Sequence, residues 1–307
     1  MSNGSRHSLG YIVESTYGTT PATPTVKALR HNTTSVGLGK DTLASEELRS
    51  DRMTVDFRHG PKQLKGDIVA ELSYGSFDDI LEAVLCGTWS AGTPDTLRNG
   101  TTRRSYTMRR IFADLASGDA YHLLKGCEFN TCELSIVPSA IVKATFGIIG
   151  QDQLTQSTEI SGATVQAALT SEAMTAINGS INEGGSAIAT VTELTIKIEN
   201  GMEARFVVGD EKTLRPSIGR SNVSGQITAY FEDGSLLNKF INETNSSLQV
   251  TLEDTAGNQY RITLPNIVYT GGQPDIGGEG PITLAMPFQA VYSASELCSI
   301  IIERDAG

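Results

Sequence analysis

Apolar and polar residues alternate along several stretches of the chain, with the period of two that is typical of a β-strand with one buried face. The clearest stretch begins at Gly66, where apolar residues stand at positions 68, 70 and 72. We predict further strands in the segments with the same pattern, which are 106–112, 121–124, 141–149, 194–198, 248–252, 260–264 and 282–288. The chain is therefore expected to be mainly β.

A helical pattern follows the strand that begins at Gly66. Apolar residues at 77, 80, 81, 84 and 85 have the spacing of one helix face. Ser76 is expected to cap this helix, with Asp79 completing a capping box. Asp78, Asp79 and Glu82 are then expected on the solvent side, close to the positive end of the helix dipole, rather than as paired catalytic carboxylates.

Three segments interrupt the strand patterns. Residues 8–25 contain Pro21 and Pro24, which oppose a regular ladder, so an extended arm is expected. Residues 36–63 carry many charges with little period, and either a long loop or an open hairpin fits them. Residues 155–185 are rich in Ser, Thr, Ala and Gly and are expected to connect two halves of the chain.

An internal repeat relates these two halves. When Gly66 is aligned with Gly225, five of the eleven positions up to Ser76 and Ser235 are identical, and an apolar helix pattern follows in both places. Strand–turn–helix units are common, so chance agreement is the alternative. The repeat is too long for a solenoid and indicates two tandem related domains. The predicted organisation is an N-terminal arm (1–26), a first domain (27–155), a connecting segment (156–187) and a second domain (188–307).

The charge balance argues against a nucleic-acid-binding protein. The 307 residues include 24 Lys and Arg against 35 Asp and Glu, a net charge of -11. Tight binding to DNA requires a basic surface that displaces counterions, whereas an acidic surface repels the polyanion and leaves it mobile. No run of about eighteen apolar residues is present, so no membrane segment is expected. The four cysteines are too few for a disulfide framework and are expected to be reduced.

No motif for catalysis, phosphate binding or metal binding stands out. Cys127 and Cys132 lack a second Cys/His pair at zinc-site spacing. The sequence has no G-x-S-x-G, and the glycines before Lys40 do not have phosphate-loop spacing. We therefore expect no catalytic residue, no metal site and no cofactor. The arginines at 98, 103, 104, 109 and 110 fit a polyanion contact and a subunit contact equally well.

Segments in both halves carry a resemblance to a known family. They are residues 14–21 (ESTYGTTP), 50–52 (SDR), 56–60 (DFRHG), 71–79 (ELSYGSFDD), 216–223 (PSIGRSNV), 229–233 (AYFED) and 269–274 (YTGGQP). Through them the chain resembles the major tail tube proteins of long-tailed, siphovirus-like bacteriophages, in the branch with a duplicated tube domain. The likeness spans nearly the full chain and is weakest over about 155–185.

The resemblance implies a fold, an assembly and a function. The fold is a barrel-forming β-sandwich of two packed sheets, with one flanking helix in each half. Strands of neighbouring subunits join into a continuous barrel around a channel, and six such domains form a ring. Three chains with two domains each would make a pseudo-hexameric homotrimer, with a homohexamer as the alternative. Stacked rings would conduct DNA into the host without binding it specifically.

The resemblance also implies partners and a location. The expected partners are further copies of the chain, the tape-measure protein, the tail terminator and the distal tail protein, with no membrane. The protein would be made in the cytoplasm of the bacterial host and incorporated into the tail of the virion.

Two sets of residues are expected to serve assembly. Stacking needs elements that reach between rings, and segments 8–25, 37–65 and 200–222 are the candidates. The residues predicted to contact the next ring are Tyr17, Pro21, Glu47, Arg49, Asp51, Arg52, Arg58, Arg215 and Arg220. Asp67 and Glu71 are predicted to line the channel, since they alternate outward from the buried positions of their strand.

The alternative function is a soluble β-sandwich adhesin or carbohydrate-binding module. Such a protein needs an exposed aromatic platform, whereas this chain has the single Trp89 and scattered tyrosines. A hydrolase would need a reactive site that the residues do not provide. The sequence therefore favours a structural protein that is not an enzyme.

Overall fold

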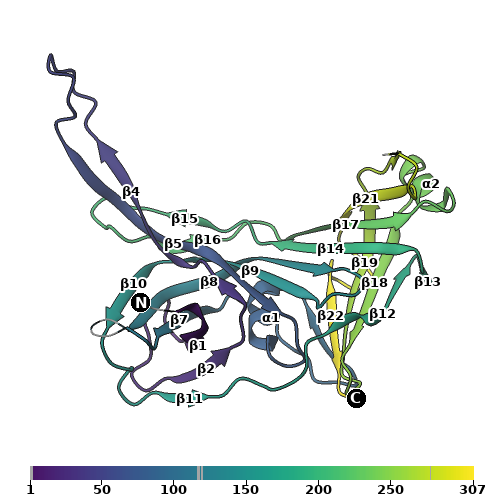
Figure 1. Ribbon diagram of the computed structural model, residues 1–307, viewed down its shortest axis with the longest axis horizontal. Helices are drawn as coiled ribbons and strands as arrows, with labels where there is room; N and C mark the ends of the chain where they lie inside the picture. The colour runs from purple at the N-terminus through teal and green to yellow at the C-terminus, as the bar shows by residue number, and fades with distance from the viewer. Residues whose placement is uncertain (1–2, 116–117, 119, 277) are drawn as a thin grey trace.

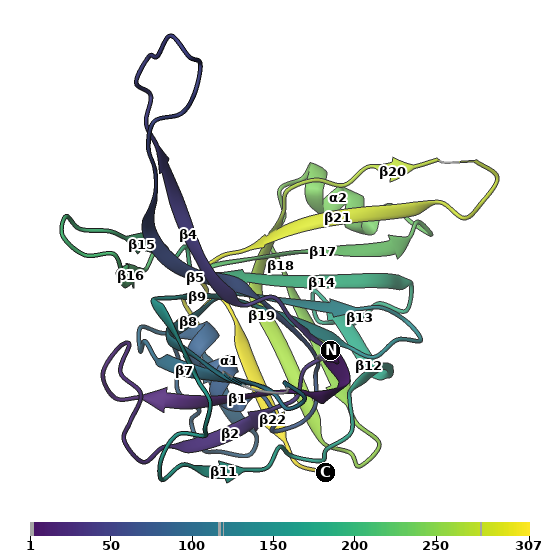
Figure 2. The same ribbon diagram turned by 60° about the vertical axis from the view of Figure 1, so that its left-hand side comes forward.

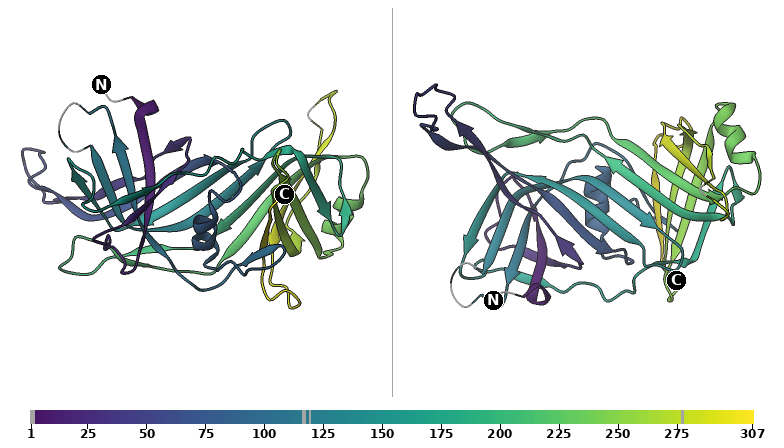
Figure 3. Two further views of the ribbon diagram at one scale, coloured as in Figure 1. Left: turned by 90° about the horizontal axis from the view of Figure 1, so that it is seen from below. Right: turned by 45° about the horizontal axis from the view of Figure 1, so that its top comes forward.

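The computed structural model describes residues 3–115, 118, 120–276 and 278–307. It confirms the mainly β fold, with two short helices, α1 (Asp78–Leu85) and α2 (Ser235–Ile241), and a 3-10 turn at Gly4–Arg6. Figure 1 and Figure 3 show two β-rich halves side by side, the N-terminal half in purple to teal and the C-terminal half in green to yellow.

The strands are numbered in chain order. Those of the first half are β1 (His7–Glu14), β2 (Thr25–Leu29), β3 (Thr33–Thr34), β4 (Gly37–Ala44), β5 (Phe57–Glu71), β6 (Asp95–Arg98), β7 (Ser105–Phe112), β8 (Tyr121–Ile136), β9 (Lys143–Gly150), β10 (Asp152–Gln156) and β11 (Thr164–Gln166). Those of the second half are β12 (Thr175–Glu183), β13 (Ser186–Ala187), β14 (Val191–Glu199), β15 (Glu203–Arg205), β16 (Leu214–Ser217), β17 (Asn222–Tyr230), β18 (Ser246–Glu253), β19 (Gln259–Tyr269), β20 (Pro274–Asp275), β21 (Thr283–Ala290) and β22 (Ile301–Asp305).

Two groups of strands and a helix build the core of the first half. One group contains β1, β2 and β7, and the other contains β4, β5 and β9. β8 belongs to both, because its first part pairs with β7 and its second part with β9. α1 buries Ile80, Leu81 and Val84 in this core, and the Phe77 ring before it stacks on Phe146 of β9.

The second half repeats the strand pairing of the first. Gly66 in β5 faces Ile148 in β9, and Gly225 in β17 faces Phe288 in β21. β8 pairs first with β10 and then with β9, as β19 pairs first with β22 and then with β21. The β7–β8 ladder shifts register between residues 106 and 108, and the β18–β19 ladder between 246 and 248. The sequence repeat therefore extends to the register of the strands.

One sheet continues from the first half into the second. β14 pairs antiparallel with β8, from Leu194 opposite Ile136 to Glu199 opposite Thr131. The sheet thus runs β4–β5–β9–β8–β14–β17–β21–β20, and Figure 2 shows its last strands stacked in this order. Within the described residues, β4 and β20 have no strand partner on their outer side. The sheet therefore ends in two open edges.

β1 corrects the prediction of an extended arm over residues 8–25. β1 lies between β2 and β7, and its Leu9, Tyr11 and Ile12 are buried. Pro21 and Pro24 lie after β1, in the loop that leads to β2, so they do not interrupt its ladder. β1 is therefore part of the core of the first half, and the rest of the segment forms the loop to β2.

Two other segments are now defined. Residues 36–63 contain the β4–β5 hairpin, so the open-hairpin alternative is confirmed. Residues 155–185 were expected to lack strand order, and this was wrong, because β11 pairs with β2 and β12 pairs with β18. Apart from Glu183, the described side chains of β11 and β12 are exposed or half-buried, so these strands lack the alternation that reveals a half-buried strand.

The predicted cap of α1 is absent. The residue at the N-cap is Phe77, and no side chain caps the helix. The hydroxyl of Ser76 instead accepts a hydrogen bond from Ser73 at 2.8 Å and lies 3.4 Å from the hydroxyl of Ser171. Ser76 therefore ties the turn before the helix to the segment that follows β11.

Candidate assembly site

The β4–β5 hairpin projects from the body of the molecule (Figure 1). It carries exposed apolar side chains, with Leu48 98%, Met53 69% and Phe57 60% exposed. Apolar groups gathered on the surface in this way mark a contact site. The predicted stacking residues on this hairpin are all exposed: Glu47, Arg49, Asp51, Arg52 and Arg58. Hydrogen bonds from Arg49 hold the pKa of Asp51 below its usual value.

Tyr17 and Arg215 are engaged within the subunit. The Arg215 guanidinium lies over the Tyr17 ring, 5.6 Å from its centroid. Pro21 is half-buried, and Arg220 is exposed in the loop between β16 and β17. For these residues, contact with a second ring stays a prediction.

Glu128 fastens the β15–β16 hairpin to the first half. Its carboxylate is 1% exposed and pairs with Arg103 at 2.5 Å and with Arg215 at 2.6 Å. Arg103 also donates to the carbonyl of Pro216 at 2.8 Å. Two guanidinium groups compensate the burial of one carboxylate. The second hairpin therefore lies along the first half, whereas the β4–β5 hairpin projects.

The other arginines of the basic cluster are also used inside the chain. Arg98 and Arg104 form ion pairs with Glu296 and Glu82, and Arg109 with Glu159. Arg110 donates to the carbonyl of Val36 at 2.6 Å and to His7. These contacts within one subunit account for the cluster without a polyanion.

The solvent face of the continuous sheet is polar and mildly acidic. Asp67 is exposed on β5, and Glu71 is half-buried and accepts a hydrogen bond from Asn32 at 2.9 Å. The burial of alternate residues places these charged positions on the face: Lys65, Asp67, Glu71, Glu133, Lys143, Glu193, Lys197 and Glu199. Acidic groups outnumber lysines there, so the face has no basic footprint for DNA.

The family model of the phage tail tube proteins matches residues 4–290, which is most of the chain. The chain belongs to the phage tail tube protein family. This is a family of structural tail components and not of enzymes, so the protein is a component of the virion tail. The resemblance read from the sequence is confirmed, and it decides against the adhesin alternative. None of the curated proteins compared matches the chain.

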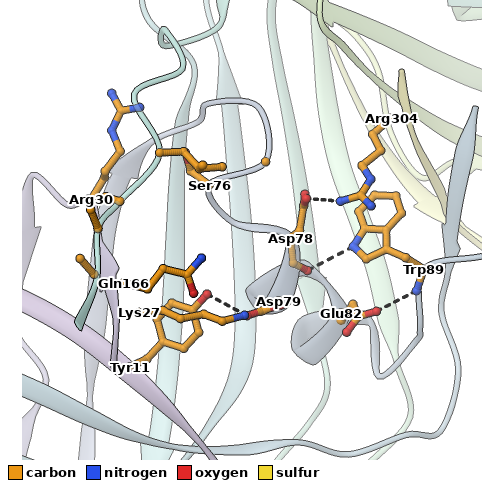
Figure 4. Close-up of a pocket in the computed structure, with 15 residues that line it drawn as sticks. Tyr11, Lys27, Arg30, Ser76, Asp78, Asp79, Glu82, Trp89, Gln166 and Arg304 are labelled. Carbon is orange, nitrogen blue, oxygen red and sulfur yellow. Dashed lines mark hydrogen bonds and ion pairs between the residues drawn. The ribbon is translucent and has the colours of Figure 1, made fainter. Parts of the chain in front are cut away.

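In this tail tube protein, Asp79 lies beside a cavity of about 390 Å³ next to α1 (Figure 4). Its carboxylate pairs with Lys27 of β2 and accepts a hydrogen bond from the Tyr11 hydroxyl at 3.0 Å. Burial, together with the negative charge of Asp79, raises the pKa of Tyr11 above its usual value. Asp79 thus joins the helix to β1 and β2.

Asp78 joins the same helix to the second half of the tail tube protein. It pairs with Arg304 of β22 and accepts a hydrogen bond from the Tyr260 hydroxyl of β19 at 2.5 Å. The Arg304 guanidinium lies over the Trp89 ring, 4.6 Å from its centroid, and the Trp89 ring nitrogen donates to the Asp78 carbonyl (Figure 4). Trp89 is therefore held in an internal contact.

These contacts correct the prediction of a solvated acidic face on α1. Asp78, Asp79 and Glu82 each have a cationic partner, with Glu82 paired to Arg104 at 3.1 Å. The cluster has a structural role, because its charges are neutralised by groups that hold the helix in place. The helix pattern could not reveal it, since Lys27 and Arg304 lie 52 and 226 residues from their partners.

The thiols of the tail tube protein are buried and free. All four cysteines are buried, and burial raises the pKa of Cys132 to about 12. In the part of the chain that the structure describes, no cluster of His, Cys, Asp and Glu could hold a metal ion. No helix among the same residues is long and apolar enough to cross a membrane.

Proposed function

We propose that this protein self-assembles into rings that stack into the tube that conducts phage DNA into the host. The observation that carries the proposal is the continuous sheet with open edges at β4 and β20, in a member of the tail tube family. An open edge leaves backbone donors and acceptors unpaired, and a neighbouring strand satisfies them.

We further propose that the chain holds two copies of one tube domain. The matched strand registers support this, because Met108 faces Leu124 in the first half as Leu248 faces Leu264 in the second. β1 and β12 take equivalent places beside β7 and β18. Each proposed copy therefore includes a strand that precedes the boundaries at 27 and 188. Three chains would form one pseudo-hexameric ring, with six chains as the alternative.

The solvent face of the continuous sheet is our candidate for the wall of the channel. Asp67 and Glu71 lie on it, among hydroxyl and amide side chains and with more acidic than basic groups. A mildly acidic wall repels the DNA backbone at short range and keeps it mobile. The tape-measure protein would occupy the same channel before DNA does, and the tail terminator and distal tail protein would contact the two ends of the tube.

The β4–β5 hairpin is our candidate for contact between rings. It projects from the body with its apolar side chains exposed, which supports a role in contacting another subunit. Glu47, Arg49, Asp51, Arg52 and Arg58 supply charged groups around this apolar surface.

Electron microscopy and native mass spectrometry of the purified protein test the proposal. We expect rings and tubes, with a ring mass of three chains of 32.7 kDa. A mass of six chains would support the homohexamer instead. A protein that remains monomeric, or that forms a small fixed oligomer without tubes, would contradict the proposed function.

A further inference from the structure

β4 stands at the outer edge of the first half in the place that β14 takes in the second. Leu38 of β4 faces Leu64 of β5, and Ile198 of β14 faces Val223 of β17. β5 and β17 are the strands that carry the sequence repeat. β14, however, has a second partner, since its other side pairs with β8. The outer side of β4 is the equivalent surface without that partner.

β20 likewise stands in the place of the end of β8. Pro274 of β20 faces Leu284 of β21, as Leu134 of β8 faces Ala144 of β9. The end of β8 is the part that pairs with β14 inside the chain. The two open edges of this sheet are thus equivalent to the two surfaces that join the halves of the chain.

We infer that residues 34–39 of one copy pair antiparallel with residues 271–276 of the next copy, in the register of the internal β8–β14 junction. Leu38 then faces Gly272, as Ile198 faces Cys132 within the chain. The inference rests on the proposed function and gives it a defined contact. Because each chain has one edge of each kind, copies join head to tail, the arrangement that closes into rings.

We call this pairing between residues 34–39 of one copy and 271–276 of the next the seam. The hydrogen-bonding groups at its centre are compatible with the inferred register. At the internal junction the amide of Asn200 donates to the carbonyl of Asn130, so every second pair from there is hydrogen-bonded, Ile196 and Leu134 included. The equivalent pair in the seam is Val36 and Pro274. Proline has no N–H to offer the carbonyl of Val36.

That carbonyl already has a donor. Arg110 Nη1 donates to the Val36 oxygen at 2.6 Å within the subunit. The register therefore places the residue without an N–H opposite a carbonyl that is already satisfied. A shift of one residue would place Pro274 opposite Ser35 or Gly37, and it would then no longer face the satisfied carbonyl of Val36.

The burial of side chains at the two places supports the same contact. Ile136 at the internal junction is 4% exposed, opposite Leu194 of β14. Its equivalent at the open edge, Ile276, is 72% exposed. In the seam Ile276 lies opposite Thr34 of the neighbouring copy. Residues 34–39 of that copy then cover Ile276 as β14 covers Ile136.

Engineered cysteines test the register. Gly37 and Gln273 form a non-hydrogen-bonded pair in the seam, with Cα atoms about 4.5 Å apart, within the range of a disulfide. A Cβ at Gly37 meets nothing closer than the Ser35 oxygen at 3.8 Å, and Gln273 is exposed. The native cysteines are buried and do not compete.

We expect oxidised G37C/Q273C protein to give a covalent ladder that ends at the trimer on a non-reducing gel. The matched control is G39C/Q273C, in which the pair is diagonal, with Cα atoms about 7–8 Å apart, and gives a several-fold lower yield. A ladder that ends at six supports the seam within a homohexamer. Equal yields from both variants, with rings visible under reducing conditions, would overturn the register while leaving the tube proposal intact.

Hydrogen exchange of the unmodified protein provides a second measurement. Amides of residues 34, 36 and 38 point toward the neighbour in this register, so peptides over 34–39 and 271–276 should exchange at least tenfold more slowly in rings than in monomers. Unchanged exchange in assembled rings overturns the seam. Absence of rings from the unmodified protein overturns the proposed function itself.

Discussion

The Nε atom of Arg215 lies 2.6 Å from a carboxylate oxygen of Glu128, although 87 residues separate them in the chain. The contact crosses from the β15–β16 hairpin of the second half to β8 of the first. The two halves are therefore joined in two places, by the β8–β14 ladder and by this contact of the β15–β16 hairpin. The β4–β5 hairpin occupies the equivalent position in the first half. Lys62 of β5 contacts Asp152 and Glu211, whereas the outer part of the hairpin projects from the body.

Replacing Glu128 should release the β15–β16 hairpin. Glu128→Gln leaves Arg103 and Arg215 without a counter-charge, and we expect the free energy of unfolding to fall by about 2 kcal/mol, less than for a fully buried pair because both arginines are partly exposed. Chemical denaturation of the unassembled protein measures this, and trypsin should cleave sooner at Arg205 and Lys212. Glu133→Gln, on the exposed face of the same strand, is the control. Equal stability of the two variants would contradict the role of Glu128.

Two glycines of the sequence repeat should resist replacement for the same reason. A Cβ at Gly66 would lie 2.6 Å from backbone atoms of Ser35, and φ there is +144°. At Gly225 it would lie 2.5 Å from the Phe288 ring and also meet the carbonyl of Thr195. We expect Gly66→Ala and Gly225→Ala each to cost about 1–3 kcal/mol of unfolding free energy.

The control for the glycine variants is Gly39→Ala. Its Cβ would meet nothing closer than the Gln63 oxygen at 3.7 Å, so stability should change by less than about 0.5 kcal/mol. Thermal unfolding of the three variants tests whether the repeated glycines are required by a close approach of strands or are repeated by chance. If Gly225→Ala were as stable as Gly39→Ala, chance would explain the repeated glycines better than a repeated close approach of strands.

The sequence could predict the strands that bury one face, but not the exposed strands or the pairing between distant strands. Strands such as β14 and β18 were predicted because each buries one face and therefore alternates. β11 is exposed along its whole length, so it offers no alternation to detect. The β8–β14 pairing and the open edges depend on contacts between distant segments, and no local pattern encodes them.

The residues of the candidate assembly site were likewise predicted only in part. The charged residues of the β4–β5 hairpin were found because a long aperiodic charged segment must lie at the surface. Tyr17 and Arg215 were predicted to contact the next ring, but Arg215 packs over the Tyr17 ring and pairs with Glu128, a partner that the neighbouring sequence does not indicate. Long-range ion pairs such as Asp78 with Arg304 were missed for this reason.

The stability of the protein should fall as the pH drops through the range in which histidine titrates. Burial, with the nearby Arg110, His31 and His122, lowers the pKa of His7 to about 4. Arg110 donates to its Nε2, so a proton there would face a guanidinium group. The unfolded chain takes up this proton near pH 6.5, whereas the folded chain does so only near pH 4. The contribution is thus complete above pH 6.5 and is lost as the pH falls toward 4.

His7→Gln removes this titration. Between pH 7 and pH 4.5 the unmodified protein should lose about 1 kcal/mol more unfolding free energy than the variant, a value reduced for solvent screening because the ring is partly exposed. Denaturant unfolding at several pH values measures the difference. His59→Gln, at an exposed position of the β4–β5 hairpin, should retain the full pH dependence. Parallel stability curves for all three proteins would rule out His7 as the cause.

The tip of the β4–β5 hairpin should affect stacking and not folding. Leu48 and Met53 are 98% and 69% exposed, so L48S/M53S removes little contact within the subunit. Burying one such side chain between rings contributes about 1.5 kcal/mol or more, and the double variant should require a roughly tenfold higher protein concentration, or more, for tubes to form. Negative-stain electron microscopy and sedimentation over a concentration series measure this threshold.

The matched control is Val165→Ser, which removes an apolar side chain that is 57% exposed on β11, away from the hairpin. Its rings should stack at the concentration of the unmodified protein. L48S/M53S should still form rings, because the open edges at β4 and β20 do not involve the tip. Tubes of normal length from L48S/M53S at the normal concentration would show that rings stack through another surface, with Tyr17, Pro21 and Arg220 as the next residues to vary.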